Sequence, residues 1–215
     1  MITLLSTKNL PPMITELQFH RAAKILDTPI STIKAVYEVE TSGGAYLPDG
    51  RVKILFEGHK FWKTLSKRGI KKSELIEAAK KHPNVLYEHW DKKQYKGGAA
   101  EWDRVSESYL VCDLLGVERG INLEAASYGS FQILGENAKL CGYYNAHEMI
   151  AAYNNGGEGE QLDSFCRFVK ARKIDGYLRE KQWAKFAEKY NGTRYRENMY
   201  DVKLAAADKR HSGNF

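Results

Sequence analysis

The stretch PISTIKAVYEVETSGG, residues 29–44, decides how the chain begins to fold, because it reads as one helix with clear signals at both ends. Ser31 or Thr32 can act as the N-cap, where a side-chain oxygen accepts a hydrogen bond from an unpaired backbone N–H. The Gly43-Gly44 pair stops the helix, since glycine is a poor helix former. These signals predict a helix over residues 30–41.

This helix has an apolar face that contains a carboxylate. At 100° per residue, one side carries Ile33, Val36, Tyr37 and Glu40. The other side carries Lys34 and Glu38, one turn apart, where an exposed ion pair contributes little. An unpaired carboxylate in a nonpolar setting has a raised pKa and stays protonated near neutral pH. Glu40 is therefore a candidate general acid. The alternative is a buried glutamate that is satisfied by an arginine or by helix-end donors.

The helix leads into AYLPDGRVKILFE, which has the pattern of a short hairpin. Residues 46–47 and 52–56 form its arms, and the Pro-Asp-Gly turn at 48–50 contains Asp49. We expect Asp49 to lie across a cleft from Glu40. Two carboxyl groups that flank a cleft are the minimum for glycoside hydrolysis, in which one protonates the leaving oxygen. The alternative is that Asp49 only bonds the backbone of its own turn.

Two further stretches place polar and aromatic side chains at a turn of the chain. NLEAASYGSFQILG, residues 122–135, predicts a helix that ends in a Ser-Tyr-Gly-Ser turn, and QWAKFAEKYNG, residues 182–192, predicts an amphipathic helix that ends in Asn-Gly. Polar groups at such turns can hydrogen-bond a sugar while aromatic rings stack on its apolar face. Trp183 and Phe186 are expected in the core, whereas Tyr190 and Asn191 are candidates for binding.

The order of these pieces resembles a known family. VETSGG, LPDGR, ILFEGHKFWK, ASYGSFQILG and FAEKYNG follow one another as in the N-acetylmuramidase family of bacteriophage endolysins. The resemblance extends from about Leu17 to Lys209. At a coarser level the chain is similar to the lysozyme superfamily, which includes goose-type lysozymes and lytic transglycosylases. This implies a mainly α, lysozyme-like α+β fold, in which a helical bundle has a short β-hairpin beside the catalytic cleft.

The resemblance implies a lysozyme-type muramidase that cleaves the β-1,4 bond between N-acetylmuramic acid and N-acetylglucosamine in peptidoglycan and lyses bacterial cells. The family's catalytic acid matches Glu40, and Asp49 and Glu57 lie in matching motifs as further catalytic candidates. Positions that line the glycan groove match Ser127, Tyr128, Gln132, Tyr190 and Asn191. Two positions depart from the pattern. Tyr128 stands where relatives often have Trp, and Gly58 stands where an Arg often follows the glutamate, which removes a cation able to pair with Glu57.

Two alternatives to hydrolysis stay open. If no second carboxylate is close to Glu40, the muramic 6-hydroxyl can attack instead, as in a lytic transglycosylase that makes a 1,6-anhydro product. If Asp49 lies about 6.5 to 9.5 Å from Glu40, hydrolysis with inversion is expected, and a distance of about 5 to 5.5 Å would favour a covalent retaining route. The other alternative is a non-catalytic, tail-associated or wall-associated protein that only binds glycan.

The charge balance suits an anionic partner. The net charge is +6 and the isoelectric point is about 9.0, which is compatible with cell-wall polymer, outer-membrane lipid head groups or nucleic acid. Nucleic acid is disfavoured, because the basic residues are scattered among acidic ones and no nucleic-acid motif is present. We expect the glycan strands of peptidoglycan as the partner, with anionic outer-membrane lipid as a second contact of the basic surface. A cleft enzyme of this size is expected to be a monomer.

The cysteine and histidine spacings do not predict a metal site or a cofactor. Cys112, Cys141 and Cys166 are far apart in the sequence and are expected to be buried free thiols. No CxxC or HExxH motif is present, which disfavours zinc peptidase or amidase chemistry. His59 lies close enough to Glu57 for a structural pairing.

The N-terminal sequence MITLLSTKNLPPMITEL lacks the basic start and the long apolar region of a secretory signal. The sequence contains no run of 18 apolar residues, so we expect no membrane span. Together with the endolysin resemblance, this predicts a protein held in the cytoplasm of the host bacterium until a separate permeabilising protein releases it to the cell wall.

Helical patterns separated by short loops occupy most of the chain. They cover residues 13–27, 30–41, 57–68, 72–81, 99–115, 122–128, 134–140, 145–154, 159–171, 174–189 and 195–209. Residues 82–102 are expected either to bridge two lobes and form a wall of the groove or to be a solvated loop. The last helix is expected to bury Tyr195, Met199, Val202 and Ala206. Residues 1–215 thus read as one catalytic domain without a separate cell-wall-binding domain.

Overall fold

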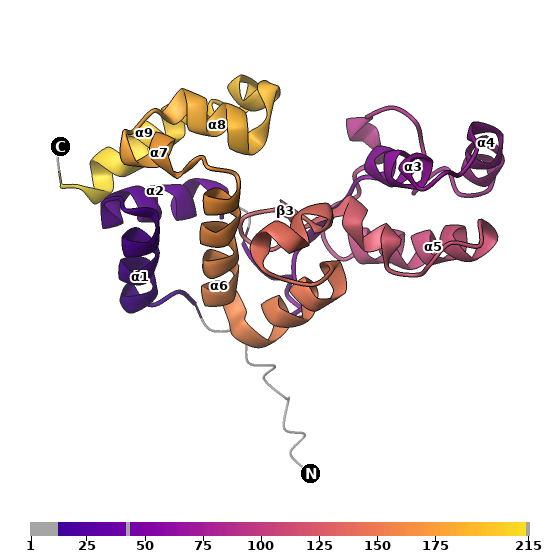
Figure 1. Ribbon diagram of the computed structural model, residues 1–215, viewed down its shortest axis with the longest axis horizontal. Helices are drawn as coiled ribbons and strands as arrows, with labels where there is room; N and C mark the ends of the chain where they lie inside the picture. Colours follow the sequence, from indigo (N-terminus) through magenta and orange to yellow (C-terminus); the bar gives the residue numbers. More distant parts are fainter. Residues whose placement is uncertain (1–12, 42–43, 214–215) are drawn as a thin grey trace, which may run out of the picture.

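The computed structural model describes residues 13–41 and 44–213, which are mainly helical (Figure 1). The elements in chain order are α1 (Glu16–Leu26), α2 (Ile30–Glu40), β1 (Ile54–Phe56), α3 (Gly58–Lys67), α4 (Lys72–Lys81), η1 (Lys92–Gln94), α5 (Ala100–Leu114), η2 (Ile121–Ala125), β2 (Ala126–Tyr128), β3 (Ile133–Leu134), η3 (Gly135–Cys141), α6 (Ala146–Ala171), α7 (Asp175–Arg179), α8 (Trp183–Asn191), η4 (Thr193–Asn198) and α9 (Tyr200–His211). The prediction of a mainly α fold with a small β component is confirmed.

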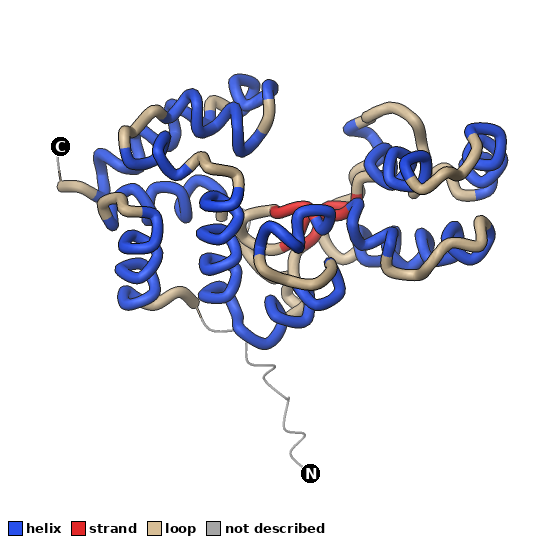
Figure 2. Tube along the Cα trace, in the orientation of Figure 1, coloured by secondary structure: helices blue, strands red, loops and turns tan. Residues whose placement is uncertain are grey.

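The helices form two lobes on either side of a small sheet. In Figures 1 and 2, α1, α2 and α6 to α9 lie on one side, and α3 to α5 lie on the other. The strands are antiparallel in the order β1-β2-β3, with Ile54 opposite Tyr128 and Ser127 opposite Leu134. The sheet thus joins the two lobes, and its central strand β2 pairs with β1, which lies about 70 residues earlier in the chain.

The predicted hairpin is present only as a turn, and the main pairing of its second strand is with a different segment of the chain. Its turn is present, because Leu47 N–H donates to the Arg51 carbonyl at 2.8 Å and Tyr46 bridges Val52. The strand that follows, however, pairs with residues 126–128, for which the sequence predicted the end of a helix. This prediction was wrong beyond residue 125, because the pairing with β1 satisfies backbone groups that a local pattern assigns to a helix.

Residues 82–102 do not bridge the lobes. They connect α4 to α5, which lie in the same lobe in Figure 1. The segment is packed there rather than solvated throughout, since the Arg104 guanidinium donates to the Asn84 carbonyl at 3.0 Å and Val85 and Leu86 are buried.

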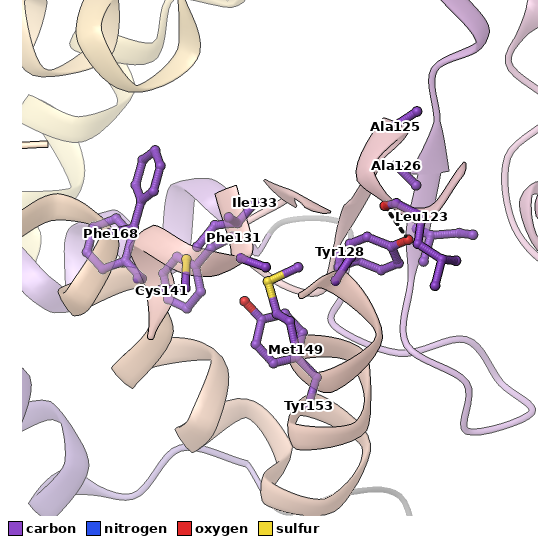
Figure 3. Close-up of a cluster of buried hydrophobic side chains, with 14 of the residues drawn as sticks. Leu123, Ala125, Ala126, Tyr128, Phe131, Ile133, Cys141, Met149, Tyr153 and Phe168 are labelled. Atoms are coloured by element: carbon purple, nitrogen blue, oxygen red, sulfur yellow. Dashed lines mark hydrogen bonds between the residues drawn. The ribbon is translucent and has the colours of Figure 1, made fainter. Parts of the chain in front are cut away.

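The buried apolar side chains form one cluster that extends through both lobes, and Figure 3 shows the part near the sheet and α6. Phe131 stacks on Phe165 with ring centroids 4.7 Å apart, and Tyr128, Met149 and Tyr153 are fully buried. The helix α6 contains Gly157 at φ 66° and ψ −159°, which interrupts the helical conformation. This interruption lies between the two predicted helices 145–154 and 159–171, so the sequence located it correctly.

The C-terminal helix α9 docks on α2 through a buried carboxylate. The Ser31 and Thr32 hydroxyls donate to Asp208 at 2.9 and 3.0 Å, and Lys181 donates at 2.7 Å. Ser31 and Thr32 are therefore not side-chain caps of α2, whose N-cap position is held by Pro29.

The predicted buried face of the last helix was wrong in part. Tyr195 is buried as expected, but Met199, Val202 and Ala206 are exposed, and Leu204 and Ala207 are buried instead. The cause is a break at Met199, which has φ 51° and separates η4 from α9. The break changes which side of the following helix faces the core.

All three cysteines are buried thiols. Within residues 13–41 and 44–213, no helix has both the length and the hydrophobicity needed to cross a membrane. In the same residues, no cluster of His, Cys, Asp or Glu side chains has the composition of a metal site.

Candidate functional site

Glu40 is the last residue of α2 and lines a pocket of about 160 Å³. The described residues around it come from the β2–β3 turn, from β3, η3 and α6, and from the end of α8 and the start of α9. They are Phe131, Gln132, Ile133, Leu134, Asn137, Phe168, Tyr190, Asn191 and Tyr200. The segments that meet here are separated by up to 160 positions in the sequence, and only the fold brings them together.

Burial dominates the electrostatics of Glu40. It raises the pKa of this carboxyl group from 4.5 to about 7, while a hydrogen bond from Asn191 opposes the shift. The Asn191 amide donates to Glu40 Oε1 at 3.5 Å. Among the side chains that the structure describes, the hydrogen-bond partner of Glu40 is thus a neutral amide rather than an arginine. Near neutral pH a substantial fraction of Glu40 carries a proton that it can donate.

Two tyrosines lie beside this carboxyl group. Burial, and next the charge of Glu40, raises the pKa of both Tyr190 and Tyr200, so both hydroxyls stay protonated at neutral pH. The Tyr190 hydroxyl donates to the Phe131 carbonyl at 2.8 Å and so ties α8 to the β2–β3 turn. Tyr200 was missed in the sequence, because a continuous helix over 195–209 gives no signal for it. The break at Met199 places it at the pocket.

Gln132 is held at both ends of its side-chain amide. Its Nε2 donates to the Gly129 carbonyl at 2.7 Å, and its Oε1 accepts from Ser127 Oγ at 3.0 Å. Gln132 has φ 46°, an uncommon conformation for a residue other than glycine, which the tight turn imposes. Ser127 is 95% buried, so it acts on the pocket through Gln132 rather than by lining it.

Tyr128 does not line the groove. The sequence predicted substrate contact, but the side chain is fully buried and its hydroxyl donates to the Leu123 carbonyl at 2.9 Å (Figure 3). A side chain without exposed surface cannot stack on a sugar. The prediction failed because β2 is the central strand of the sheet and all three of its residues are buried, whereas the sequence predicted a helix and turn here.

A polar network behind the pocket connects its walls. The Tyr37 hydroxyl, one turn before Glu40, donates to Glu158 at the interruption of α6, and Ser130 Oγ donates to the same carboxylate at 3.4 Å. Ser130 N–H also donates to Gln161 Oε1 at 2.6 Å. These bonds fix the β2–β3 turn relative to the end of α2.

Glu57 follows β1 directly and occupies a second, separate environment. Its side chain is only 17% exposed, and burial raises its pKa, although Lys60 and a hydrogen bond from Tyr95 oppose the shift. The Tyr95 hydroxyl lies 3.4 Å from Glu57 Oε2, and His59 Nε2 lies 3.5 Å from the same oxygen. The expected pairing with His59 is therefore present. Lys60 supplies a positive charge near Glu57.

Asp49 is engaged in its own turn. Its carboxylate accepts from the Arg51 backbone at 3.0 Å and from Arg51 Nε at 2.8 Å, and the side chain is 41% exposed. It is not among the described residues that line the pocket of Glu40. These contacts match the alternative reading, in which the aspartate stabilises the turn.

The outer face of α2 carries exposed ion pairs, but not the expected one. Glu38 pairs with Arg210 and His211 of α9, and Lys34 pairs with Glu16 at 2.8 Å. Partners on other helices displace the pair within the helix. Glu38 and Glu40 nevertheless have the different environments that the helical periodicity predicted.

A larger hollow of about 550 Å³ lies elsewhere, between α5, η2 and η3. None of the sequence-predicted site residues lines it. Its lining includes the ion pair of Arg68 and Glu124, so part of its charge is internally compensated. The smaller pocket at Glu40 is the better candidate site, because it combines a carboxyl group of raised pKa with preorganised polar groups.

Comparisons with known proteins reveal similarity over most of the chain. A family model described as muramidase, N-acetylmuramidase, matches residues 29–212. Among solved structures, the crystal structure of the Burkholderia AP3 phage endolysin is similar, with 38% identity and a TM-score of 0.81, over 94% of this chain and 72% of that chain. A search of curated proteins gave no match.

Proposed function

The chain belongs to the N-acetylmuramidase family, and on that premise we propose that it is a peptidoglycan hydrolase of the phage endolysin type. The proposed reaction is hydrolysis of the β-1,4 bond between N-acetylmuramic acid and N-acetylglucosamine. Glu40 is the proposed general acid. The observation that carries the proposal is its position in a pocket lined by polar and aromatic side chains, where burial raises the pKa of Glu40 to about 7.

In this mechanism Glu40 donates its proton to the glycosidic oxygen as the bond to the anomeric carbon breaks. Asn191 orients the carboxyl group and favours the carboxylate that remains after proton transfer. The amide of Gln132, fixed by Ser127 and Gly129, is the proposed hydrogen-bonding group for the sugar. Holding these groups before substrate arrives lowers the reorganisation needed in the transition state.

Glu57 is the proposed second carboxylate, in preference to Asp49. Its partly buried side chain follows β1, which pairs with the strand that leads into the turn at Glu40's pocket. Asp49 is instead bound to Arg51. The Glu57 carboxylate would activate a water molecule that attacks the anomeric centre, with the sugar's configuration inverted if the two carboxyl groups leave room for that water.

One observation favours the runner-up, a lytic transglycosylase. Among the described residues that line its pocket, Glu40 is the only carboxylate. A single acid suffices when the muramic 6-hydroxyl is the nucleophile, and the product then carries a 1,6-anhydro ring.

Mass spectrometry of digested peptidoglycan tests these proposals. Wild type should release fragments with reducing N-acetylmuramic acid, and Glu40→Gln, which keeps the shape and removes the proton, should lose several orders of magnitude of turnover. Glu38→Gln is the matched control on the same helix and should keep wild-type activity, since Glu38 is exposed.

Glu57→Gln separates hydrolysis from transglycosylation. Loss of turnover supports a second catalytic carboxylate, whereas full turnover with anhydro products, each lighter by one water, establishes the runner-up. Absence of cleavage by the wild type, with glycan binding retained, would leave a non-catalytic binding protein.

We further propose that the chain acts as a monomeric, single catalytic domain that a separate permeabilising protein releases to the wall. Outer-membrane lipid is a proposed second contact of its basic surface. Arg210 and His211 contribute less to that surface than the sequence suggests, because both are paired with Glu38. Lys209 and the overall charge of +6 carry this part of the proposal.

A further inference from the structure

A buried ion pair on α5 contacts the residue that precedes Glu57. Glu101 and Arg104 are 0% and 3% exposed, and Arg104 Nη1 donates to Glu101 Oε2 at 2.7 Å. Burial of two charges costs free energy that their attraction does not always repay, so such a pair is often no more stabilising than apolar residues of similar size. The hydrogen bonds that the pair makes with the rest of the fold therefore indicate its role.

The pair holds both backbone polar groups of Phe56. Phe56 N–H donates to Glu101 Oε2 at 3.0 Å, and Arg104 Nη1 donates to the Phe56 carbonyl at 2.7 Å. β1 lies at an edge of the described sheet, where backbone groups need partners other than a neighbouring strand. Beside β2, Glu57 N–H donates to the Ala125 carbonyl at 2.9 Å. The backbone that leads into Glu57 is thus held by α5 as well as by the sheet.

The backbone that follows Glu57 is held by the same guanidinium through a tyrosine. Gly58 N–H and Arg104 Nη2 both donate to the Tyr87 hydroxyl, each at 3.1 Å. A Cβ atom at position 58 would lie 2.3 Å from Tyr87 Cε1 and 2.7 Å from the Val85 carbonyl oxygen, so a larger residue would displace this ring. Arg104 therefore fixes the peptide groups on both sides of Glu57.

The pair also anchors the loop that carries a hydrogen-bond donor to Glu57. Lys96 and Gly97 N–H donate to Glu101 Oε1 at 2.7 and 2.9 Å, directly after Tyr95. The Tyr95 hydroxyl lies 3.4 Å from Glu57 Oε2. Burial alone would raise the pKa of Glu101, but its backbone donors and the guanidinium outweigh burial and lower the pKa. Glu101 thus stays ionised and keeps the loop in place.

We propose that Glu101 and Arg104 are positioning residues for Glu57. The inference rests on the proposed function, in which Glu57 is the second carboxylate, and adds the groups that set its position. The strand before Glu57, the helix after it and the loop that carries Tyr95 are all attached to this one pair. Because both side chains are buried, they act through Glu57 rather than on the sugar. A misplacement of about 1 Å can cost about a hundredfold in rate, so such a pair can control kcat.

The titratable groups near Glu57 come from several segments of the fold. They are His59 and Lys60 of α3, Tyr95 of the α4–α5 segment, Arg104 of α5 and Glu136 of η3. Burial raises the pKa of Glu57, and the positive charge of Arg104 is one of the influences that oppose burial. A glutamine at position 104 would remove that charge. A lysine would keep a charge but lose the fixed fork of donors, so the two substitutions separate charge from geometry.

Steady-state kinetics on a soluble peptidoglycan fragment test the geometry. Arg104→Lys should lower kcat about a hundredfold and leave KM nearly unchanged, because one ammonium group cannot serve Phe56, Glu101 and Tyr87 at once. In the Glu57→Gln background the same substitution should lower the residual rate by less than about twofold, because the residue that it positions is already disabled. Equal losses in the two backgrounds would show a merely structural role and overturn the proposal.

The pH dependence of kcat tests the charge. Arg104→Gln should move the acid limb of the profile to higher pH, because Glu57 must be ionised to activate water and its pKa rises when a nearby cation is lost. Arg104→Lys should leave this limb in place. An unmoved limb in Arg104→Gln would show that the pair does not act through Glu57. Each variant is assayed well below its melting temperature, so that loss of folded protein does not enter the rates.

Two further variants complete the experiment. Glu101→Gln has a single acceptor oxygen for the strand and the loop, so it should lower kcat as Arg104→Lys does. Glu107→Gln is the matched control on the same helix, because Glu107 pairs with His82 at the end of α4, at 3.2 Å. It should keep the kcat and the pH profile of the wild type.

The inference and the proposed function fail in different ways. If Glu57→Gln cleaves as fast as the wild type, the second-carboxylate role in the proposed function is overturned, and the positioning role with it. If Glu57→Gln is impaired but Arg104→Lys and Glu101→Gln keep full kcat, only the positioning role is overturned.

Discussion

At the scale of a single residue, the position of Glu40 in α2 sets the pKa of its carboxyl group. The helical period puts it on the buried face of α2, and the end of the helix puts it at the wall of a small pocket. Desolvation then raises its pKa to about 7. For Glu38, two residues earlier, burial is the largest single influence and would raise the pKa, but the hydrogen bonds and charges of Arg210 and His211 together outweigh it and lower the pKa. The pKa values of two glutamates on opposite faces of one helix are thus shifted in opposite directions.

The raised pKa of Glu40 predicts the pH dependence of activity. A general acid works in its protonated form, so kcat/KM on a soluble glycan should fall as pH rises through about 7. Asn191 favours the charged form, and Asn191→Ala should therefore raise the pKa and move this limb to higher pH. Initial rates of both proteins, measured between pH 4 and pH 9 at constant ionic strength, would show the shift. A limb that moves to lower pH in the variant would contradict the assignment of Glu40 as the acid.

At the scale of an element, the C-terminal helix depends on one buried carboxylate. Asp208 accepts hydrogen bonds from Ser31 and Thr32 at the start of α2 and pairs with Lys181. Burial alone would raise the pKa of Asp208, but these donors outweigh it and lower the pKa. Because α9 begins with Tyr200, its docking also completes the pocket of Glu40.

Asp208→Asn should destabilise the protein by about 2 kcal/mol, the range for hydrogen bonds to a charged group. The pKa of Asp208 is lower in the folded than in the unfolded protein, so its contribution is present above the unfolded value of about 3.8 and is lost as pH falls through the folded value. The difference in unfolding free energy from wild type should therefore shrink toward acid pH. Urea denaturation at pH 7 and pH 3 would measure it.

Glu77→Gln serves as the control for this experiment. Glu77 forms an exposed pair with Lys80, and such pairs contribute little. A loss of stability for Asp208→Asn no larger than for Glu77→Gln would show that the buried carboxylate does not hold α9.

Other elements show where local patterns succeed. The helix over 30–41 and the separation of 145–154 from 159–171 were predicted correctly, because amphipathic period, Gly pairs and helix stops are local signals. The strand at 126–128 was missed, because it is short and exists only through pairing with β1. The break at Met199 was missed too, since a non-glycine residue in the left-handed conformation gives no signal in the sequence.

At the scale of the whole molecule, the sheet joins a lobe that contains Glu40 to a lobe that begins with Glu57 and α3 (Figures 1 and 2). The two candidate carboxylates thus belong to opposite lobes. This arrangement suits a long polymer better than a small ligand, because contacts on both lobes can be spread along a strand.

The net charge of +6 predicts how the molecule meets its substrate. Attraction to an anionic cell wall is a long-range effect that salt screens, since the Debye length falls from about 30 Å at 0.01 M to about 3 Å at 1 M. The rate on intact cell walls should therefore fall as salt is raised over this range. The rate on a neutral, soluble glycan should change much less. Equal salt dependence on the two substrates would show that the positive field does not recruit the wall.

The sequence by itself determined the helical character of the chain, the position of Glu40 at the end of a buried helix face and the motifs that place the chain in its family. The helical pattern is a local property of the sequence, and the order of the motifs can be read along the chain without knowledge of the fold. Only the tertiary structure decided that Asn191, 151 residues away, bonds Glu40. It also placed Tyr128 in the core and tied Glu57 to Tyr95 and Trp90. Burial and long-range hydrogen bonds set these outcomes, because both depend on which distant segments pack together.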